Sequence, residues 1–240
     1  MIGIVTPLGL EAKCLGSWAP RRRGDVRQQG ERIAIVSGVG WRAATEAADK
    51  LVRNGATSLI SFGTAGALDR DLLPGTLLLP RRVISGDTQI PLDESWGERI
   101  AGCLEPGERS CQEPLAHASE VQATVDQKKR LRGKSGAAAV DMESAAVAAF
   151  ATEHGLPCVV VRVIADAAWT PLPDSVIAAV DEHGEIRAGR VLRSLVTKPQ
   201  DFGPLISVFR SFRRAQAMLE RIARRTEPRF LAPVLDEPRR

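Results

Sequence analysis

One acid stands on the apolar face of a helix that is predicted to begin near Asp141. Residues three, four and seven apart are neighbours on a helix, so Glu143 shares a face with Ala146, Val147 and Phe150. A charge in such a place costs free energy unless it is paired or hydrogen-bonded. Glu143 therefore needs a partner, either in the protein or in a ligand.

Three more charged residues stand in apolar surroundings. Asp166 closes the most apolar predicted strand, residues 158–165, and Arg162 lies within that strand. Glu11 follows the first predicted strand, although an exposed acid is the default expectation there. Two interpretations remain open: Arg162 neutralises Glu143 or Glu11 in a structural network, or these charges form a functional site with shifted pKa values.

The elements that position these residues follow from short apolar runs rich in valine and isoleucine, which predict buried strands. The runs are residues 2–5, 33–36, 59–62, 76–79, 137–140 and 159–164. Helical patterns follow several of them, at residues 41–54, 143–154 and 175–181. This alternation predicts a three-layer α/β fold. Residues 85–118 are richer in polar residues, Gly and Pro, and are assigned to loops with a little helix.

Two glycine-rich stretches, Ser37 to Gly40 and Gly63 to Gly66, each come directly after a predicted strand. Glycine lets a ligand approach the backbone closely. For a lone pair of glycines, a tight turn without a ligand is the more common explanation. Open α/β sheets, however, bind ligands at the carboxyl ends of their strands, which favours the first explanation.

Composition bounds the class of protein. The 240 residues, 44% of them apolar, suffice for one domain with a full core. The net charge is only +4, Tyr is absent and aromatic residues are few, which argues against a nucleic-acid partner. No signal peptide and no membrane-spanning run are evident, so we expect a soluble cytoplasmic protein.

The four cysteines, Cys14, Cys103, Cys111 and Cys158, are scattered and form no CxxC pair. No histidine stands at metal-ligand spacing, so reduced thiols and no metal are expected.

A boundary is predicted near Lys198 and Pro199, followed by an amphipathic helix. The apolar residues that recur at helical spacing are Leu205, Val208, Phe209, Phe212, Ala215, Leu219 and Ile222, with arginines at 210, 213, 214, 221, 224 and 225. The helix either packs on its own domain or lies on an anionic membrane surface. Residues 226–240 are rich in proline and predicted to be disordered. The predicted division is therefore 1–197, 198–225 and 226–240.

Five motifs occur in an order that matches a known superfamily. They are Ile-Gly-Ile-Val with Glu11 after it, Ser-Gly-Val-Gly at 37–40, Phe-Gly-Thr-Ala-Gly-Ala-Leu at 62–68, Asp-Met-Glu-Ser-Ala-Ala at 141–146 and Val-Val-Val-Arg-Val-Ile-Ala-Asp at 159–166. Over about residues 1–170 the chain resembles the nucleoside phosphorylase and nucleosidase superfamily, in particular methylthioadenosine/S-adenosylhomocysteine nucleosidases. The resemblance implies a three-layer α/β/α fold with a mixed, partly barrel-like central sheet, no cofactor and a homodimer.

Two further stretches look like the hopanoid-biosynthesis branch of that superfamily. They are Ala-Ala-Ala-Val-Asp-Met-Glu-Ser at 137–144 and Asp-Ala-Ala-Trp-Thr-Pro-Leu-Pro at 166–173. With the arginine-rich end, they extend the resemblance over almost the whole chain. This branch is associated with removal of adenine from adenosylhopane.

The resemblance also implies roles for single residues. Glu143 would bind the ribose hydroxyls while Met142 packs against the sugar, and Asp166 would protonate or hydrogen-bond purine N7. An acid at N7 stabilises the leaving purine, and burial would raise its pKa to suit that task. Ala165 replaces the serine that supports this acid in the methylthioadenosine enzymes. The base would lie at Gly66, Val121 and Gln122.

For the nucleophile, the resemblance assigns the attacking water to Glu11 and places Thr64, Arg162 and Gly38 around it. A phosphorylase needs an anion site of arginine, hydroxyl and backbone N–H groups, which these residues could supply. Glu11 beside them would repel phosphate, which favours water, although relatives in this branch are often described as phosphorylases.

The expected function is cleavage of the N-ribosyl bond of a 5'-substituted adenosine, converting adenosylhopane to ribosylhopane at the inner face of the membrane. Phosphorolysis, methylthioadenosine/S-adenosylhomocysteine cleavage and a non-catalytic nucleoside-binding module remain alternatives.

Overall fold

The computed structural model describes residues 1–173, 202–227, 230 and 232. The strands are β1 (Ile2–Thr6), β2 (Val26–Gln29), β3 (Arg32–Val36), β4 (Ser58–Ala67), β5 (Leu77–Leu78), β6 (Arg82–Ser85), β7 (Thr88–Pro91), β8 (Ser110–Cys111), β9 (Leu115–His117), β10 (Ala139–Asp141) and β11 (Cys158–Asp166). The helices are α1 (Gly9–Ala12), η1 (Lys13–Leu15), α2 (Trp41–Arg53), α3 (Glu94–Ala101), α4 (Val125–Ser135), α5 (Ser144–Glu153) and α8 (Phe202–Arg225). The predicted helix at 175–181 and the boundary near Lys198 lie outside the described residues.

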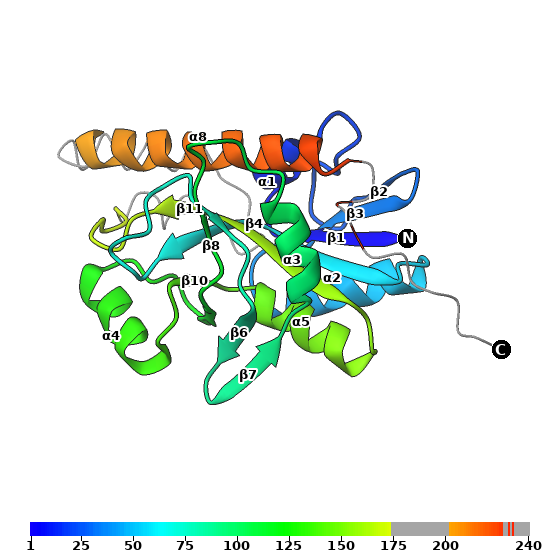
Figure 1. Ribbon diagram of the computed structural model, residues 1–240, viewed down its shortest axis with the longest axis horizontal. Helices are drawn as coiled ribbons and strands as arrows, with labels where there is room; N and C mark the ends of the chain where they lie inside the picture. The colour runs from blue at the N-terminus through cyan, green and yellow to red at the C-terminus, as the bar shows by residue number, and fades with distance from the viewer. Residues whose placement is uncertain (174–201, 228–229, 231, 233–240) are drawn as a thin grey trace.

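The strands form one mixed sheet that branches at β4. Its main path runs β2-β3-β1-β4-β10-β9-β6-β7, and β11 pairs with β4 and β5. The first half of β4 pairs in parallel with β1, most of its length pairs in parallel with β11, and its end pairs antiparallel with β10. The mixed sheet and the helices on both sides of it confirm the predicted α/β fold class (Figure 1).

Two predictions about local structure are wrong. The stretch Gly63 to Gly66 is not a turn after a strand, because β4 continues through it while pairing with β11. Residues 85–118 are not mainly loops, because they contain β7, β8 and β9 besides α3. The stretch Ser37 to Gly40 does connect a strand to a helix, and Gly38 and Gly40 have φ of 85° and 96°, a region that favours glycine.

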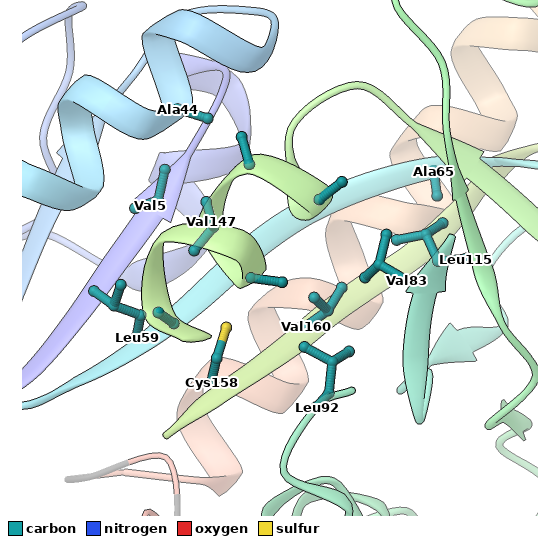
Figure 2. Packing of buried hydrophobic residues seen from close by; sticks show 14 of the residues in the cluster. Val5, Ala44, Leu59, Ala65, Val83, Leu92, Leu115, Val147, Cys158 and Val160 are labelled. Carbon is teal, nitrogen blue, oxygen red and sulfur yellow. The ribbon is translucent and has the colours of Figure 1, made fainter. Parts of the chain in front are cut away.

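Alternate residues of β11 face opposite layers, as strand geometry requires. Val160 packs with Val147 of α5 in one core (Figure 2), to which Ile164 also belongs, whereas Val159 and Val161 belong to a second core. The α5 layer, which also includes α2, lies opposite α8 across the sheet (Figure 1). Arg162 has the same parity as Val160 and Ile164, so the strand directs it towards the α5 layer.

The two halves of α8 differ in burial. Ala215, Met218, Leu219, Ile222 and Ala223 are buried in the second core. In the first half, Ile206 is 37% exposed and Phe209 is 60% exposed. The second half therefore packs on its own domain, whereas the first half presents apolar side chains to solvent.

Part of the segment that was predicted to be disordered is packed. Thr226 is buried at the end of α8, and the buried Phe230 accepts a hydrogen bond from Nε1 of Trp96 through its carbonyl oxygen. Residues 228–229, 231 and 233–240 lie outside the described part, so the division at 197 and 225 stays a prediction. Among the described residues, no helix is both long and apolar enough to cross a membrane.

The packing of α8 makes a prediction about stability. Leu219→Ala should lower the free energy of unfolding by about 2–5 kcal/mol, because it removes a buried side chain from a packed core. Phe209→Ala on the exposed half should change it by no more than about 0.5 kcal/mol. Urea unfolding of both variants tests this, and equally small effects would show that α8 does not pack on the core.

Candidate functional site

Glu11 is a buried acid held by the strand beside it. Its Oε1 accepts hydrogen bonds from the backbone N–H of Thr64 at 2.8 Å and from Thr64 Oγ1 at 2.6 Å, and its Oε2 accepts one from Leu8 N at 3.2 Å. Burial raises the pKa of Glu11, while the charge of Arg162 and these hydrogen bonds lower it. A fixed carboxylate with a raised pKa can act as a general base.

Gly63 lets two charged groups lie against the middle of β4. A Cβ atom on this residue would stand 2.4 Å from Nη1 of Arg162 and 2.9 Å from Oε2 of Glu11. Both distances are too short for a Cβ atom, so a larger residue here would force the side-chain ends of Arg162 and Glu11 to move away from β4. The sequence predicted close approach of a ligand to this glycine, and the atoms that approach it are charged atoms of the protein.

Arg162 is fully buried, and its main partner is Asp141. Its Nε donates to Asp141 Oδ2 at 2.7 Å, and its Nη2 donates to Ser61 Oγ at 2.9 Å and lies 4.0 Å from Glu143 Oε2. Within the described residues, Nη1 has no hydrogen-bond acceptor. Asp141 in turn accepts hydrogen bonds from the backbone N–H and hydroxyl of Ser144.

Asp141 is therefore a site residue that the sequence interpretation did not select. Glu143 and Glu11 were the predicted partners of Arg162, but the short ion pair is with Asp141. The available signal was its position two residues before Glu143 in the motif at 141–146.

Glu143 directly precedes α5 and is buried beside Arg162. Its Oε1 accepts a hydrogen bond from the backbone N–H of Gly40 at 2.8 Å. Burial, and then the charge of Asp141, raise the pKa of Glu143 to about 8. The predicted residue Met142 is half-buried next to it, and Gly38 lies in the same β3–α2 connection as Gly40.

Asp166 lies at the far end of the same strand pair. Its Cα pairs with Gly66 after a register shift between Ile164 and Asp166, whereas Arg162 pairs with Gly63. The step from Gly63 to Gly66 corresponds to roughly 10 Å along β4. The register shift is the kind of local irregularity that re-aims a side chain.

The Asp166 carboxyl group lies between β4 and a lysine. A Cβ atom on Gly66 would stand 3.2 Å and 3.3 Å from its two oxygens, so the small residue gives the carboxyl group its room. On the other side, Nζ of Lys128 donates a hydrogen bond to Oδ2. Burial raises the pKa of Asp166, and Lys128 lowers it.

The predicted base-binding residues Val121 and Gln122 occupy the segment before α4. Val121 is 42% exposed, and the side-chain amide of Gln122 donates to Glu120 O. The carbonyl of Ala123, one residue further, accepts from Leu172 N at 2.8 Å, which places the segment beside the chain that follows Asp166.

Trp41 and His117 adjoin the site and were not predicted. Their rings meet edge to face with centroids 5.2 Å apart, and His117 pairs in the sheet with Asp141. Burial lowers the pKa of His117. Trp41 and Gly40 also line a surface pocket of about 470 Å³ at the start of α2, so this pocket adjoins Glu143. Within the described part of the chain, no group of three or more His, Cys, Asp or Glu side chains could hold a metal ion.

Comparison with known proteins gives a family and a fold. The family model described as "Phosphorylase superfamily" matches residues 21–197. A comparison with curated proteins gave no significant match.

Several solved structures share the fold. A methylthioadenosine/S-adenosylhomocysteine nucleosidase of Neisseria meningitidis, in complex with methylthio-immucillin-A, has a TM-score of 0.68 at 16% identity, over 93% of this chain and 96% of that one. Futalosine hydrolase of Helicobacter pylori has a TM-score of 0.65 at 19% identity, over 93% and 97%. An S-adenosylhomocysteine nucleosidase of Streptococcus pyogenes has a TM-score of 0.66 at 19% identity, over 95% and 97%.

The raised pKa of Glu143 predicts how stability depends on pH. The folded chain binds this proton more tightly than the unfolded chain, so Glu143 contributes stability below its ordinary pKa of 4.5 that is lost as pH rises through about 8. Glu143→Gln, which stays neutral and has nearly the same shape, should flatten the decline in stability between about pH 5 and about pH 9. Urea midpoints across this range measure it, with the exposed Glu153→Gln as control. Parallel curves for wild type and Glu143→Gln would contradict the assignment.

Proposed function

The chain belongs to the phosphorylase superfamily, and we propose that it cleaves the N-ribosyl bond of a 5'-substituted adenosine and releases adenine. The observation that carries the proposal is the order of acids along the β4–β11 pair. Glu11 and Arg162 converge at Gly63, and Asp166 lies at Gly66. Glu143 lies beside Arg162 on the same layer.

This arrangement of acids can stabilise a ribose that becomes positively charged as it loses its base. Cleavage gives an oxocarbenium-like ribose and an electron-rich purine, so catalysis needs negative groups near the sugar and an acid near the base. Glu143 accepts hydrogen bonds from the ribose hydroxyls. Asp166 transfers its carboxyl proton to purine N7 as the electron pair of the C1'–N9 bond passes to the purine.

We propose water as the nucleophile. Glu11 takes the proton of a water molecule whose oxygen bonds to C1', and Thr64 fixes the orientation of the carboxylate that does so. Nη1 of Arg162 supplies a donor towards the same point. Among the described residues the cluster holds three carboxyl groups against one guanidinium, namely Glu11, Asp141 and Glu143 against Arg162. A phosphate ion would add negative charge to this excess of acids.

The proposed substrate is adenosylhopane, and the product is ribosylhopane. Support comes from the likeness of residues 137–144 and 166–173 to the hopanoid-biosynthesis branch. The neighbouring structures named for methylthioadenosine and S-adenosylhomocysteine cleavage keep a smaller 5' group as the alternative. A homodimer stays an expectation from the resemblance.

A lipid-tailed substrate gives the exposed half of α8 a role. Phe209 and Ile206 present apolar surface, and Arg210 and Arg213 on the same half, with Arg214 next to them, are exposed. Apolar side chains that enter the headgroup region, with arginines near anionic lipids, bind a membrane surface. We propose that the protein works on the cytoplasmic side, peripherally attached through this half of α8.

The reaction is tested by a product assay. Wild-type protein incubated with adenosine, 5'-methylthioadenosine and an adenosine with a long 5' alkyl chain should release free adenine from at least one of them. Adding phosphate should leave the rate and the sugar product unchanged, because water attacks C1'. Chromatography identifies both products, and a ribose 1-phosphate would show that phosphate is the nucleophile.

Two variants connect that activity to the acids. Asp166→Asn and Glu11→Gln keep the shape of each side chain but remove its proton transfer, which typically supplies about 10²- to 10⁴-fold in rate. Each should lose that much kcat in folded protein, and Asp166→Asn should also lower the unfolding midpoint because it leaves the buried Lys128 ammonium without its charge partner. The exposed Asp126→Asn is the control. Wild-type kcat in either folded variant would remove that residue from the mechanism.

The membrane role is tested by substitution on the exposed half of α8. Ile206→Asp with Phe209→Asp should weaken binding to vesicles containing anionic lipid by about tenfold or more, because two apolar side chains leave the interface. Ala217→Asp adds the same kind of charge at an exposed position on the packed half and should bind like wild type. Turnover of a short water-soluble adenosine should match wild type in all variants. Unchanged vesicle binding by the double variant would contradict the role.

A further inference from the structure

Lys128 is the buried residue of an otherwise polar helix. It is 1% exposed, whereas its neighbours Lys129 and Arg130 on α4 are exposed. A lysine is almost never fully buried unless its charge is paired. The partner here is the Asp166 carboxyl group.

The ammonium group of Lys128 uses all three of its donors inside the protein. Nζ donates to Asp166 Oδ2, to the carbonyl oxygen of Ala167 at 2.9 Å and to that of Thr170 at 3.0 Å. An ammonium has three N–H groups and no acceptor, so none is left for a ligand. Any effect of Lys128 on a reaction therefore passes through Asp166 or through the segment that follows it.

The same contacts fix which carboxyl oxygen stays available. Gly66 bounds the carboxyl group on the β4 side, and Lys128 takes Oδ2. Among the described residues, no protein donor is found for Oδ1. The side chain of Asp166 is 12% exposed, so the protein does not enclose it completely.

Lys128 also joins the two segments that border Asp166. It holds Ala167 and Thr170, and the hydrogen bond from Leu172 N to the Ala123 carbonyl oxygen ties the same segment to the residues before α4. Among the described residues, Lys128 is the ionisable group that faces Asp166. β4 contributes only Gly66 there, and the following segment contributes carbonyl oxygens.

We propose that Lys128 is a positioning residue for the leaving-group acid: it holds Oδ2 of Asp166, presents Oδ1 to the base and stabilises the carboxylate left after proton transfer. This role rests on the proposed function. The O–H proton of Asp166 moves to N7, the C1'–N9 electron pair passes to the purine, and the carboxylate that remains is paired with the Lys128 ammonium. Burial alone would hold the proton too tightly, and the cation makes it easier to give up.

Lys128→Met tests the role because it removes the charge and keeps the length of the side chain. With 5'-methylthioadenosine, or the panel nucleoside that wild type cleaves fastest, kcat should fall about 10- to 100-fold with little change in KM. In the pH profile of kcat, the alkaline limb should move to a pH higher by about one unit or more. An opposite charge lowers a nearby carboxyl pKa by about 1–3 units, and this variant removes that charge. Lys129→Met, on the exposed neighbour, should match wild type in both.

Lys128→Gln keeps hydrogen-bond donors at the position and removes the charge, so it serves if the methionine variant unfolds. It should show the same movement of the alkaline limb. A neutral variant with wild-type kcat, or with lower kcat and an unmoved limb, would overturn the role and leave α4 attachment as the function of Lys128. Failure of wild type to release adenine from the whole panel would instead overturn the proposed function, and the role of Lys128 with it.

Discussion

The site depends on one buried guanidinium. Arg162 is paired with Asp141 at 2.7 Å, lies 4.0 Å from Glu143 and reaches Gly63 beside Glu11. Burying a guanidinium is tolerable only with such partners, and removing it would leave several carboxyl groups buried without a cation. The parity of β11, the glycine opposite it and the start of α5 all serve to place this group.

The carboxyl groups around Arg162 outnumber its single positive charge. These groups are Glu11, Asp141 and Glu143, and burial, followed by the charge of Asp141, raises the pKa of Glu143 to about 8, which favours the neutral form of that carboxyl group. A ribose that gains positive charge would also offset the excess of carboxyl groups, because carboxylates stabilise a cation that develops between them. The same excess disfavours an anionic nucleophile. The charges and the geometry of the site therefore both support the proposed hydrolytic cleavage of an N-ribosyl bond.

The sequence singles out Glu11, Glu143, Arg162 and Asp166 as charges in apolar stretches, and the structure buries the first three and leaves Asp166 12% exposed. Helical periodicity predicted this for Glu143 and the apolar strand predicted it for Arg162 and Asp166, whereas exposure was the default expectation for Glu11. The α/β class follows from the alternation of strands and helices. The partners did not follow, because pairing across strands depends on register. Lys128 lies in a run of basic residues that looks like a solvated helix face, and nothing in its spacing marks it as buried. The short strands β7, β8 and β9 are held by their neighbours in the sheet and carry too few residues for a periodic signal.

The helix α8 shows why the chemistry and the suggested membrane role cannot be separated by truncation. Its Gln216 donates a hydrogen bond to the carbonyl oxygen of Leu10, in α1, directly before Glu11. Its buried half shares a core with Ala12 of α1 and with alternate residues of β11, the strand that carries Arg162 and Asp166. Loss of the helix would therefore disturb the support of Glu11 as well as any surface contact. Exposed side chains of its first half, such as Phe209, can be changed without touching that support, because the structure places them outside both cores.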